Sequence, residues 1–349
     1  MRLFVVSCVL VLLLAIIGLG GAYVAMRHLN VFQEYETAYA GSCIPVVGVP
    51  GVEDMAADVS LKRAWLSSMD RRDISGQVRG AIIAFDPENP LDTASWRDRT
   101  GGVPAVFEPL GIDLYKDEEV HRLFVVNAAR PSVLIYDVGP DGRLDLAQTL
   151  TDTRLTSPNS VVAVGPSEFY VTNSSQGAGR GLLSDLGFLI GTASGSVLYF
   201  DGSSWSNAAD ELKRANGIEI SADGAKLYVA ETSAKSVAIF DRDIRSGVIV
   251  PAGALSLEGF PDNINRLEDG TLLVGTIPKP WSFSKHTSSA DALSPSRIVK
   301  IEMPYEAEGM PEALFQDDGE GLSGATSAVR LGQKLLIGAY AENKFLLCN

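Results

Sequence analysis

The chain has 349 residues, 46% of them hydrophobic, and its 43 acidic and 29 basic residues leave a formal net charge of −14. A chain of this length and apolar content can bury a large hydrophobic core. The excess of acidic residues, and the absence of a basic stripe interleaved with aromatic residues, argue against nucleic acid as a partner.

The first predicted element is an apolar helix. Residues 3–25 carry no charge over 23 positions and lie between Arg2 and Arg27. At 1.5 Å per residue, such a helix is roughly 35 Å long, enough to cross a bilayer. The apolar stretch of a cleaved signal peptide is shorter, about 7–15 residues. We therefore predict a transmembrane signal anchor that is not cleaved.

This helix divides the chain into three predicted parts. Residues 1–28 form the anchor, 29–42 a linker and 43–349 one globular domain outside the cytoplasm, in the secretory pathway or the periplasm. The alternative is cleavage after Ala25 or Ala40, which would release a secreted protein.

The globular part repeats a pattern of three predicted strands. The clearest copy opens at Asn216, turns at Asp223-Gly224 and ends near Asp241. An Asp-Gly turn between short apolar runs is typical of a β-hairpin. Successive copies open at Glu53, Leu110, Asn159, Asn216, Asp262 and Ala325, with intervals from 46 (216 to 262) to 63 (262 to 325) residues. Repeats of this length are typical of propeller blades, so we predict an all-β fold, a six-bladed β-propeller.

The residues that open the blades form a candidate metal site. In a propeller the first strand of each blade lines the central channel, so these residues lie near one axis. Their carboxylate and amide oxygens suit a calcium ion better than zinc. The predicted ligands are Glu53, Asn159, Asn216, Asp262 and Asn263. The alternative is that these Asn and Asp residues only cap turns.

Two cysteines lie at the ends of the globular part. A bridge between Cys43 and Cys348 would close the propeller ring, and oxidation is expected in an exported chain. Joining residues about 300 apart contributes on the order of 5 kcal/mol in the loop-entropy model. Cys8 lies in the apolar helix and is expected to stay free. Two unpaired thiols are the alternative for Cys43 and Cys348.

A glycosylation sequon, Asn173-Ser174-Ser175, follows an apolar run in the third blade. In an exported chain, Asn173 is the expected glycan attachment site, which would make the protein a glycoprotein.

From about residue 40 to its end, the chain resembles the paraoxonase/arylesterase family of calcium-dependent lactonases and esterases. These propellers share their architecture with gluconolactonases and strictosidine-synthase-like proteins. The matching motifs are Gly51-Val52-Glu53-Asp54, Leu123-Phe124-Val125-Val126-Asn127, Asn159-Ser160-Val161-Val162, Ala215-Asn216-Gly217-Ile218, Asp262-Asn263-Ile264 and Lys334-Leu335-Leu336-Ile337-Gly338.

The resemblance implies that Glu53, Asn159, Asn216, Asp262 and Asn263 hold a catalytic calcium, the same set that the repeat indicates. It also implies a second, structural calcium at the Asp54 carboxylate and a backbone carbonyl near Ile112. At the position of the family's second aspartate this chain has Ser160. The lower charge of that cage disfavours its occupancy.

The main departure from the family concerns its catalytic histidine pair. Leu110 and Ala128 stand at the matching positions, and neither side chain can move a proton. The three histidines of the chain, His28, His121 and His286, are expected to be surface residues.

Two function hypotheses follow. In the first, calcium stabilises the oxyanion formed in lactone or aryl-ester hydrolysis, Asn159 and Asn216 orient the substrate, and Glu53 or Asp262 accepts the proton from water. In the second, the propeller is not catalytic, calcium makes it rigid and its upper face binds a partner. A gluconolactonase-like activity is a weaker alternative.

An apolar insert occupies residues 181–190. Its Leu and Ile side chains fit a helical stripe, which is more often packing than function. The resemblance implies instead that the insert walls the active site and touches lipid. We therefore expect a small lipophilic lactone or ester as substrate, and a second membrane contact at this insert.

Overall fold

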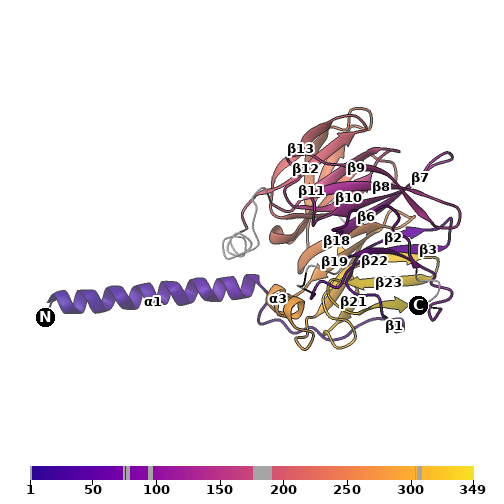
Figure 1. Cartoon of the computed structure of the whole chain (residues 1–349). Helices are drawn as coiled ribbons and strands as arrows, with labels where there is room; N and C mark the ends of the chain where they lie inside the picture. Colours follow the sequence, from indigo (N-terminus) through magenta and orange to yellow (C-terminus); the bar gives the residue numbers. More distant parts are fainter. Residues whose placement is uncertain are drawn as a thin grey trace.

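The computed structural model describes residues 2–73, 75, 79–92, 97–175, 191–302, 304 and 309–349. Six antiparallel sheets of four strands each are arranged around one axis, and one long helix projects from the assembly (Figure 1). This confirms the predicted all-β, six-bladed propeller. The predicted lipid-facing insert at 181–190 lies outside the described residues.

The blades follow one another along the chain. Blade 1 contains β2 (Val52–Asp58), β3 (Arg63–Ser68), β4 (Ala81–Phe85) and β5 (Arg97–Asp98); blade 2 contains β6 (Pro109–Lys116), β7 (His121–Asn127), β8 (Ser132–Val138) and β9 (Leu144–Leu150); blade 3 contains β10 (Pro158–Ala163), β11 (Glu168–Asn173), β12 (Gly195–Asp201) and β13 (Trp205–Leu212). Blade 4 contains β14 (Ala215–Ile220), β15 (Lys226–Glu231), β16 (Ser236–Arg242) and β17 (Ile249–Ser256); blade 5 contains β18 (Phe260–Arg266), β19 (Leu272–Ile277), β20 (Ser296–Ile301) and β21 (Pro311–Asp317); blade 6 contains β22 (Ala325–Leu331), β23 (Lys334–Ala339), β24 (Lys344–Cys348) and β1 (Cys43–Val47).

Blade 6 closes the ring because its outermost strand comes from the other end of the domain. Strand β1 pairs antiparallel with β24, and Cys43 lies opposite Cys348 in that register. The two cysteines form the predicted disulfide, across 305 residues of sequence. First and last segments are thus joined both by a strand ladder and by a covalent bond.

Turn chemistry and blade packing explain why these segments form hairpins. Gly224 and Gly270 adopt φ values of 72° and 90°, which glycine reaches without steric cost. The apolar faces of neighbouring blades pack on each other; Phe85 of blade 1 and Phe345 of blade 6, for example, meet edge-on at 4.9 Å between ring centres. The hydrophobic core is therefore distributed around the ring, between the blades.

Each innermost strand (β2, β6, β10, β14, β18 and β22) begins on the same face of the propeller, which we call the upper face. Because the strands alternate in direction, the loops after each second strand also lie there. These loops carry α3 (Pro280–Ser288) and the short 3₁₀ helix η2 (Thr232–Ala234).

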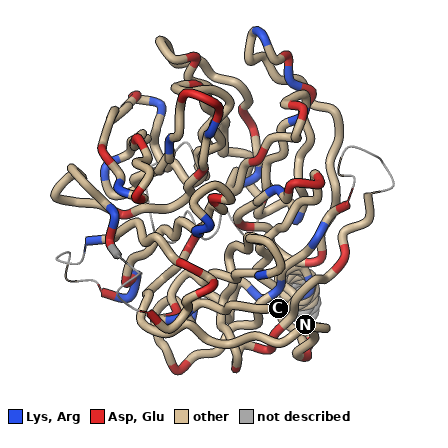
Figure 2. The backbone as a smooth tube through the Cα atoms, turned by 90° about the vertical axis from the view of Figure 1, so that its right-hand side faces the viewer, with Lys and Arg blue, Asp and Glu red and all other residues tan. Residues whose placement is uncertain are grey.

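In Figure 2, seen from the side opposite the long helix, acidic and basic residues are interspersed.

The N-terminal helix α1 (Arg2–His28) points away from the propeller (Figure 1). Within the described part of the chain, no helix is long and apolar enough to cross a membrane. The predicted transmembrane anchor is therefore not supported.

The predicted linker packs against the propeller. Its Asn30 Nδ2 donates to the Pro278 carbonyl at 3.0 Å, and Ala38 exchanges backbone hydrogen bonds of 2.9 Å with Gln316. The C-terminal end of α1 is thereby held against blade 5.

Candidate functional site

A β-bulge interrupts every innermost strand close to its beginning. The register shifts fall between Val52 and Met55, Pro109 and Ile112, Pro158 and Val161, Ala215 and Ile218, Pro261 and Ile264, and Ala325 and Ser327. A bulge breaks the ladder and redirects the side chains of the unpaired residues. All five predicted calcium ligands are bulge residues, which explains how regular strands present them at the channel.

Hydroxyl groups from the second strands, or from the turns after them, hold these bulges in place. Thr172 Oγ1 donates to the Asn216 carbonyl at 2.7 Å, and Thr232 Oγ1 donates to the Pro261 carbonyl at 2.8 Å. The same Thr232 oxygen accepts from Asn216 Nδ2 at 3.2 Å. The two contacts to backbone carbonyls join neighbouring blades, so the packing of the ring also positions the ligands.

The side-chain amide nitrogens of Asn216 and Asn263 both donate hydrogen bonds within the protein, which orients their amide oxygens away from these partners. Asn263 Nδ2 donates to Glu53 Oε1 and to the Glu53 carbonyl, both at 3.0 Å, and Asn216 Nδ2 donates to Thr232. Four buried oxygens then have no hydrogen-bond partner: Glu53 Oε2, Asn159 Oδ1, Asn216 Oδ1 and Asn263 Oδ1. Burying unpaired polar atoms is costly. Unpaired, buried carboxylate and amide oxygens are the ligands that calcium prefers, so the residues present fit calcium.

The two acids of this set are buried close to each other. Glu53 is 2% exposed and Asp262 6% exposed. Burial raises the pKa of Glu53, while burial and the negative charge of Glu53 raise the pKa of Asp262 to about 8. A positive charge bound beside the two carboxyl groups would oppose both of these rises in pKa.

Among the residues that the structure describes, no group of three or more His, Cys, Asp or Glu side chains could hold a metal ion. The predicted set contains only two such residues, Glu53 and Asp262, and relies on asparagine oxygens for the rest. It therefore suits a hard, oxygen-preferring ion and offers zinc no nitrogen or sulfur ligand.

The second predicted calcium has weaker structural support. Asp54 accepts hydrogen bonds from the backbone N–H groups of Met55 at 2.8 Å and Ile112 at 3.0 Å, and from Asn265 Nδ2 at 3.4 Å. Ile112 thus meets Asp54 through its N–H rather than through its carbonyl. Neither Asp54 nor Ser160, within the described residues, contributes a buried side-chain oxygen that lacks a partner. This position does not fit a cation in the way that the first does.

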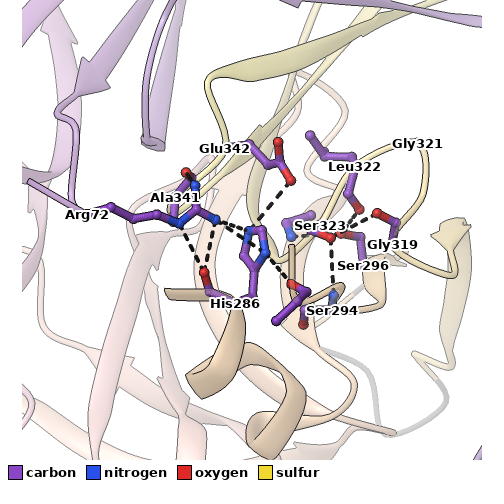
Figure 3. Close-up of polar contacts among 12 residues, drawn as sticks. Arg72, His286, Ser294, Ser296, Gly319, Gly321, Leu322, Ser323, Ala341 and Glu342 are labelled. Atoms are coloured by element: carbon purple, nitrogen blue, oxygen red, sulfur yellow. Dashed lines mark hydrogen bonds and ion pairs between the residues drawn. The ribbon is translucent and has the colours of Figure 1, made fainter. Parts of the chain in front are cut away.

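The expectation that the histidines are surface residues is wrong for His286, while His121 is half-buried. His286 is fully buried on α3, where Arg72 Nη2 lies 2.9 Å from its Nε2 and also donates to its carbonyl at 2.9 Å (Figure 3). His121 Nε2 lies 2.9 Å from the buried Asp58 carboxylate. Burial lowers the pKa of both histidines.

These histidines serve packing between loops and blades. Arg72 also donates to the Ala341 carbonyl, so His286 joins the upper-face loops of blades 1, 5 and 6. His28, at the end of α1, meets the ring of Phe260 edge-on at 5.8 Å. Leu110 packs against the hydrophobic cluster between blades 2 and 3.

Glycosylation at Asn173 is not supported. Asn173 is fully buried, its Oδ1 accepts from the N–H groups of Thr156 and Ser157 at 3.2 Å, and its Nδ2 donates to the Arg154 carbonyl at 2.9 Å. The folded chain therefore uses this amide to hold the loop before β10, and leaves no room for a glycan there.

The structure adds one charged residue that the repeat pattern missed. Arg71 lies in the upper-face loop after β3, and its positive charge opposes the rise in pKa of both Glu53 and Asp262. Because the loop lies outside the repeated strands, no spacing in the sequence points to it.

Comparisons with known proteins agree with this architecture. Residues 64–349 match the family model described as Arylesterase. Serum paraoxonase/arylesterase 1 of Rattus norvegicus is 27% identical over 333 residues, which cover 89% of this chain and 90% of that protein. Mechanosensory abnormality protein 6 of Caenorhabditis elegans is 26% identical over 242 residues, 67% of this chain and 63% of that protein.

The solved structure of a gluconolactonase from Xanthomonas campestris superposes with a TM-score of 0.59 at 16% identity, covering 90% of this chain and 94% of that one. Identity this low shows the shared fold alone. The family match, in contrast, spans most of the sequence, from blade 1 to the C-terminus. The chain belongs to the arylesterase family.

Proposed function

We propose that this protein is a calcium-dependent hydrolase of small lactones or aryl esters, with its reaction centre at the upper end of the channel. The observation that carries the proposal is the set of four buried, unpartnered oxygens on Glu53, Asn159, Asn216 and Asn263. Membership of the arylesterase family supports hydrolysis as the reaction class.

The residues divide into positioning and chemical roles. Glu53 and the asparagine oxygens would hold the calcium ion, which when bound supplies the positive charge that stabilises an oxyanion. Asn263 fixes the orientation of Glu53, and Thr232 fixes that of Asn216. In the absence of histidines at positions 110 and 128, Asp262 or Glu53 would accept the proton of the attacking water.

The test is turnover of a panel of lactones and aryl esters by the purified chain, with calcium and with a chelator. We expect turnover that the chelator abolishes and that Glu53→Gln reduces together with calcium affinity. Glu118→Gln, an exposed substitution that also removes one negative charge, is the matched control and should behave as the unmodified chain. Turnover that resists the chelator would contradict the proposal.

One observation favours a second candidate, a propeller that binds calcium without catalysis. Leu110 and Ala128 bring no ionisable side chain to the upper end of the channel. If calcium raises the thermal unfolding midpoint but no substrate of the panel is turned over, this second function replaces the first.

We further propose that the domain works outside the cytoplasm. The disulfide between Cys43 and Cys348 supports this location, because such bonds persist in oxidising compartments. The similarity to a rat protein that is named serum paraoxonase/arylesterase 1 also supports it. Free, alkylatable thiols at both positions in protein recovered from its native cells would argue against it.

A further inference from the structure

Arg71 follows β3 of blade 1 and is held on the upper face by one residue from each adjacent blade, blade 2 and blade 6. Its Nη2 donates to the carbonyl of Pro109, the first residue of β6, at 2.9 Å. Its guanidinium carbon lies 4.9 Å from the ring centre of Tyr340, in the loop after β23. A hydrogen bond and a cation–π contact together fix the plane of the guanidinium between blades 2 and 6.

The remaining N–H groups of Arg71 have no partner. Nε and Nη1 are both buried and make no hydrogen bond. The adjacent Arg72 differs, because its guanidinium donates to the carbonyls of His286 and Ala341. An arginine is always protonated, and burying its charged donors without acceptors is costly. An acceptor from outside the chain would satisfy the Arg71 guanidinium.

The charge of Arg71 acts directly on the candidate site. Pro109, whose carbonyl accepts from Arg71, opens the innermost strand β6 at the same upper end of the channel as Glu53 and Asp262. The positive charge of Arg71 also opposes the rise in pKa of both acids. These two acids balance the charge of one bound calcium ion. Arg71 then adds a positive charge beside a neutral centre, where an anionic group would find both a counter-charge and free donors.

We propose that Arg71 is a specificity-determining residue that binds a carboxylate on the substrate, so that the preferred esters or lactones carry one negative charge besides the scissile carbonyl. This inference rests on the proposed hydrolase function and names its substrate class. Arg71 recognises the substrate and moves no proton, because its guanidinium stays charged throughout.

The kinetic test uses two esters that differ only at the end of the acyl chain: phenyl hydrogen adipate carries a terminal carboxylate, and phenyl hexanoate a methyl group. We expect a higher kcat/KM for the adipate. With calcium at saturating concentration, Arg71→Gln should lower kcat/KM for the adipate about 10- to 100-fold and change the value for the hexanoate less than about threefold. Arg71→Lys keeps the charge but changes the hydrogen-bond donors. Its kcat/KM for the adipate should lie between those of the unmodified chain and Arg71→Gln.

Arg245→Gln is the control, because Arg245 is an exposed arginine on the opposite face of the propeller. It should leave both esters unaffected. Higher ionic strength should reduce the ratio of kcat/KM for the adipate to kcat/KM for the hexanoate in the unmodified chain, since salt screens the attraction between Arg71 and the carboxylate. Equal turnover of the two esters by the unmodified chain, or an equal loss on both in Arg71→Gln, would overturn the inference and leave the hydrolase function intact.

A binding measurement separates this inference from the proposed function. The probes are the matching amides, adipic acid monoanilide and hexananilide, titrated calorimetrically into the calcium-loaded chain. The inference is supported if the monoanilide binds more tightly than hexananilide and Arg71→Gln abolishes this difference in affinity. This holds even if no ester is turned over, since absence of turnover contradicts only the hydrolase function. Equal affinity for both amides overturns the inference whatever the activity.

Discussion

Acids lie on innermost strands in both parts of the central channel, buried at the upper end and half-buried farther along, but their oxygens are used differently. At the upper end, Glu53 and three asparagines leave four oxygens without partners. Farther along the strands, Asp113 accepts from the N–H groups of Leu114 at 2.8 Å and Ala163 at 2.7 Å. Glu219 likewise accepts from Ile220 at 2.8 Å and Arg266 at 3.0 Å.

This difference teaches that acidity alone does not mark a site in this channel. Asp113 and Glu219 each accept from the next residue of their own strand and from the innermost strand of the following blade, so they tie blades together. The upper-end oxygens lack such donors and are available to a ligand. The proposed reaction centre is at the end of the channel where these oxygens stay unpaired.

The largest effect is expected from Glu53→Gln at the upper end. The substitution removes one of the two negative charges of the set and should weaken calcium binding and hydrolysis together, about 100-fold. Calcium titration calorimetry and chelator-controlled assays measure both. Glu219→Gln, in the lower part of the channel, is the comparison and should leave calcium affinity unchanged. Equal losses in both variants would remove the distinction between the two ends.

Histidines introduced at the upper end should raise activity there, whereas the preceding substitution lowers it. If a dedicated base is all that the upper end lacks, Leu110→His combined with Ala128→His should raise aryl-ester turnover about tenfold or more. The readout is kcat as a function of pH, which should acquire a new dependence near the histidine range. No gain in a variant that still binds calcium would show that these positions do not limit the reaction.

A smaller effect is expected from Asn216→Ala. The variant loses an unpaired oxygen without a change in charge, so calcium affinity should fall only about tenfold. It also loses the hydrogen bond to Thr232. Thr232→Val loses that bond and, in addition, the bond to the Pro261 carbonyl, so it gives an upper limit for the contribution of the Thr232 contact. Unchanged calcium affinity in Asn216→Ala would contradict a direct role for the Asn216 oxygen.

The smallest effect is expected in the pH dependence of stability, and it concerns the lower part of the channel. Burial first, and the charge of Asp113 second, raise the pKa of Glu219 to about 8. Since this pKa is raised on folding, the folded state gains stability from the protonated carboxyl. That gain is complete below the ordinary glutamate pKa, about 4.3, and is lost as the pH rises through about 8.

Glu219→Gln cannot titrate, so its unfolding free energy should fall less between about pH 5 and about pH 9 than that of the unmodified chain. Chemical denaturation at fixed calcium concentration measures both. Glu118→Gln, an exposed substitution, should keep the unmodified pH dependence. The idea fails if Glu219→Gln and the unmodified chain lose the same free energy over this range.

Local patterns in the sequence predicted much of this fold because they depend on neighbours along the chain. The Asp223-Gly224 turn and the apolar runs around it indicate a hairpin, and six repeats of that pattern indicate six blades. Cys43 and Cys348 stand at the two ends of the repeats, where a closing bridge belongs. The five candidate ligands were likewise predicted from their shared place at the start of a repeat.

Contacts between blades decided what the patterns could not. Asn173 matches a glycosylation sequon, yet folding buries it as the support of a loop. His286 stands in a serine-rich stretch, yet Arg72, 214 residues away in sequence, covers it.

Strand periodicity and turn chemistry are local properties, so the sequence predicts the number of blades, their closure and the kind of residue that opens each blade. Which oxygens stay unpaired, and where the Arg71 guanidinium keeps two nitrogens without hydrogen bonds, depends on the tertiary structure. The physical reason is that a hydrogen-bond partner is set by distance in space: Arg71 meets Pro109 and Tyr340, which are far from it in sequence.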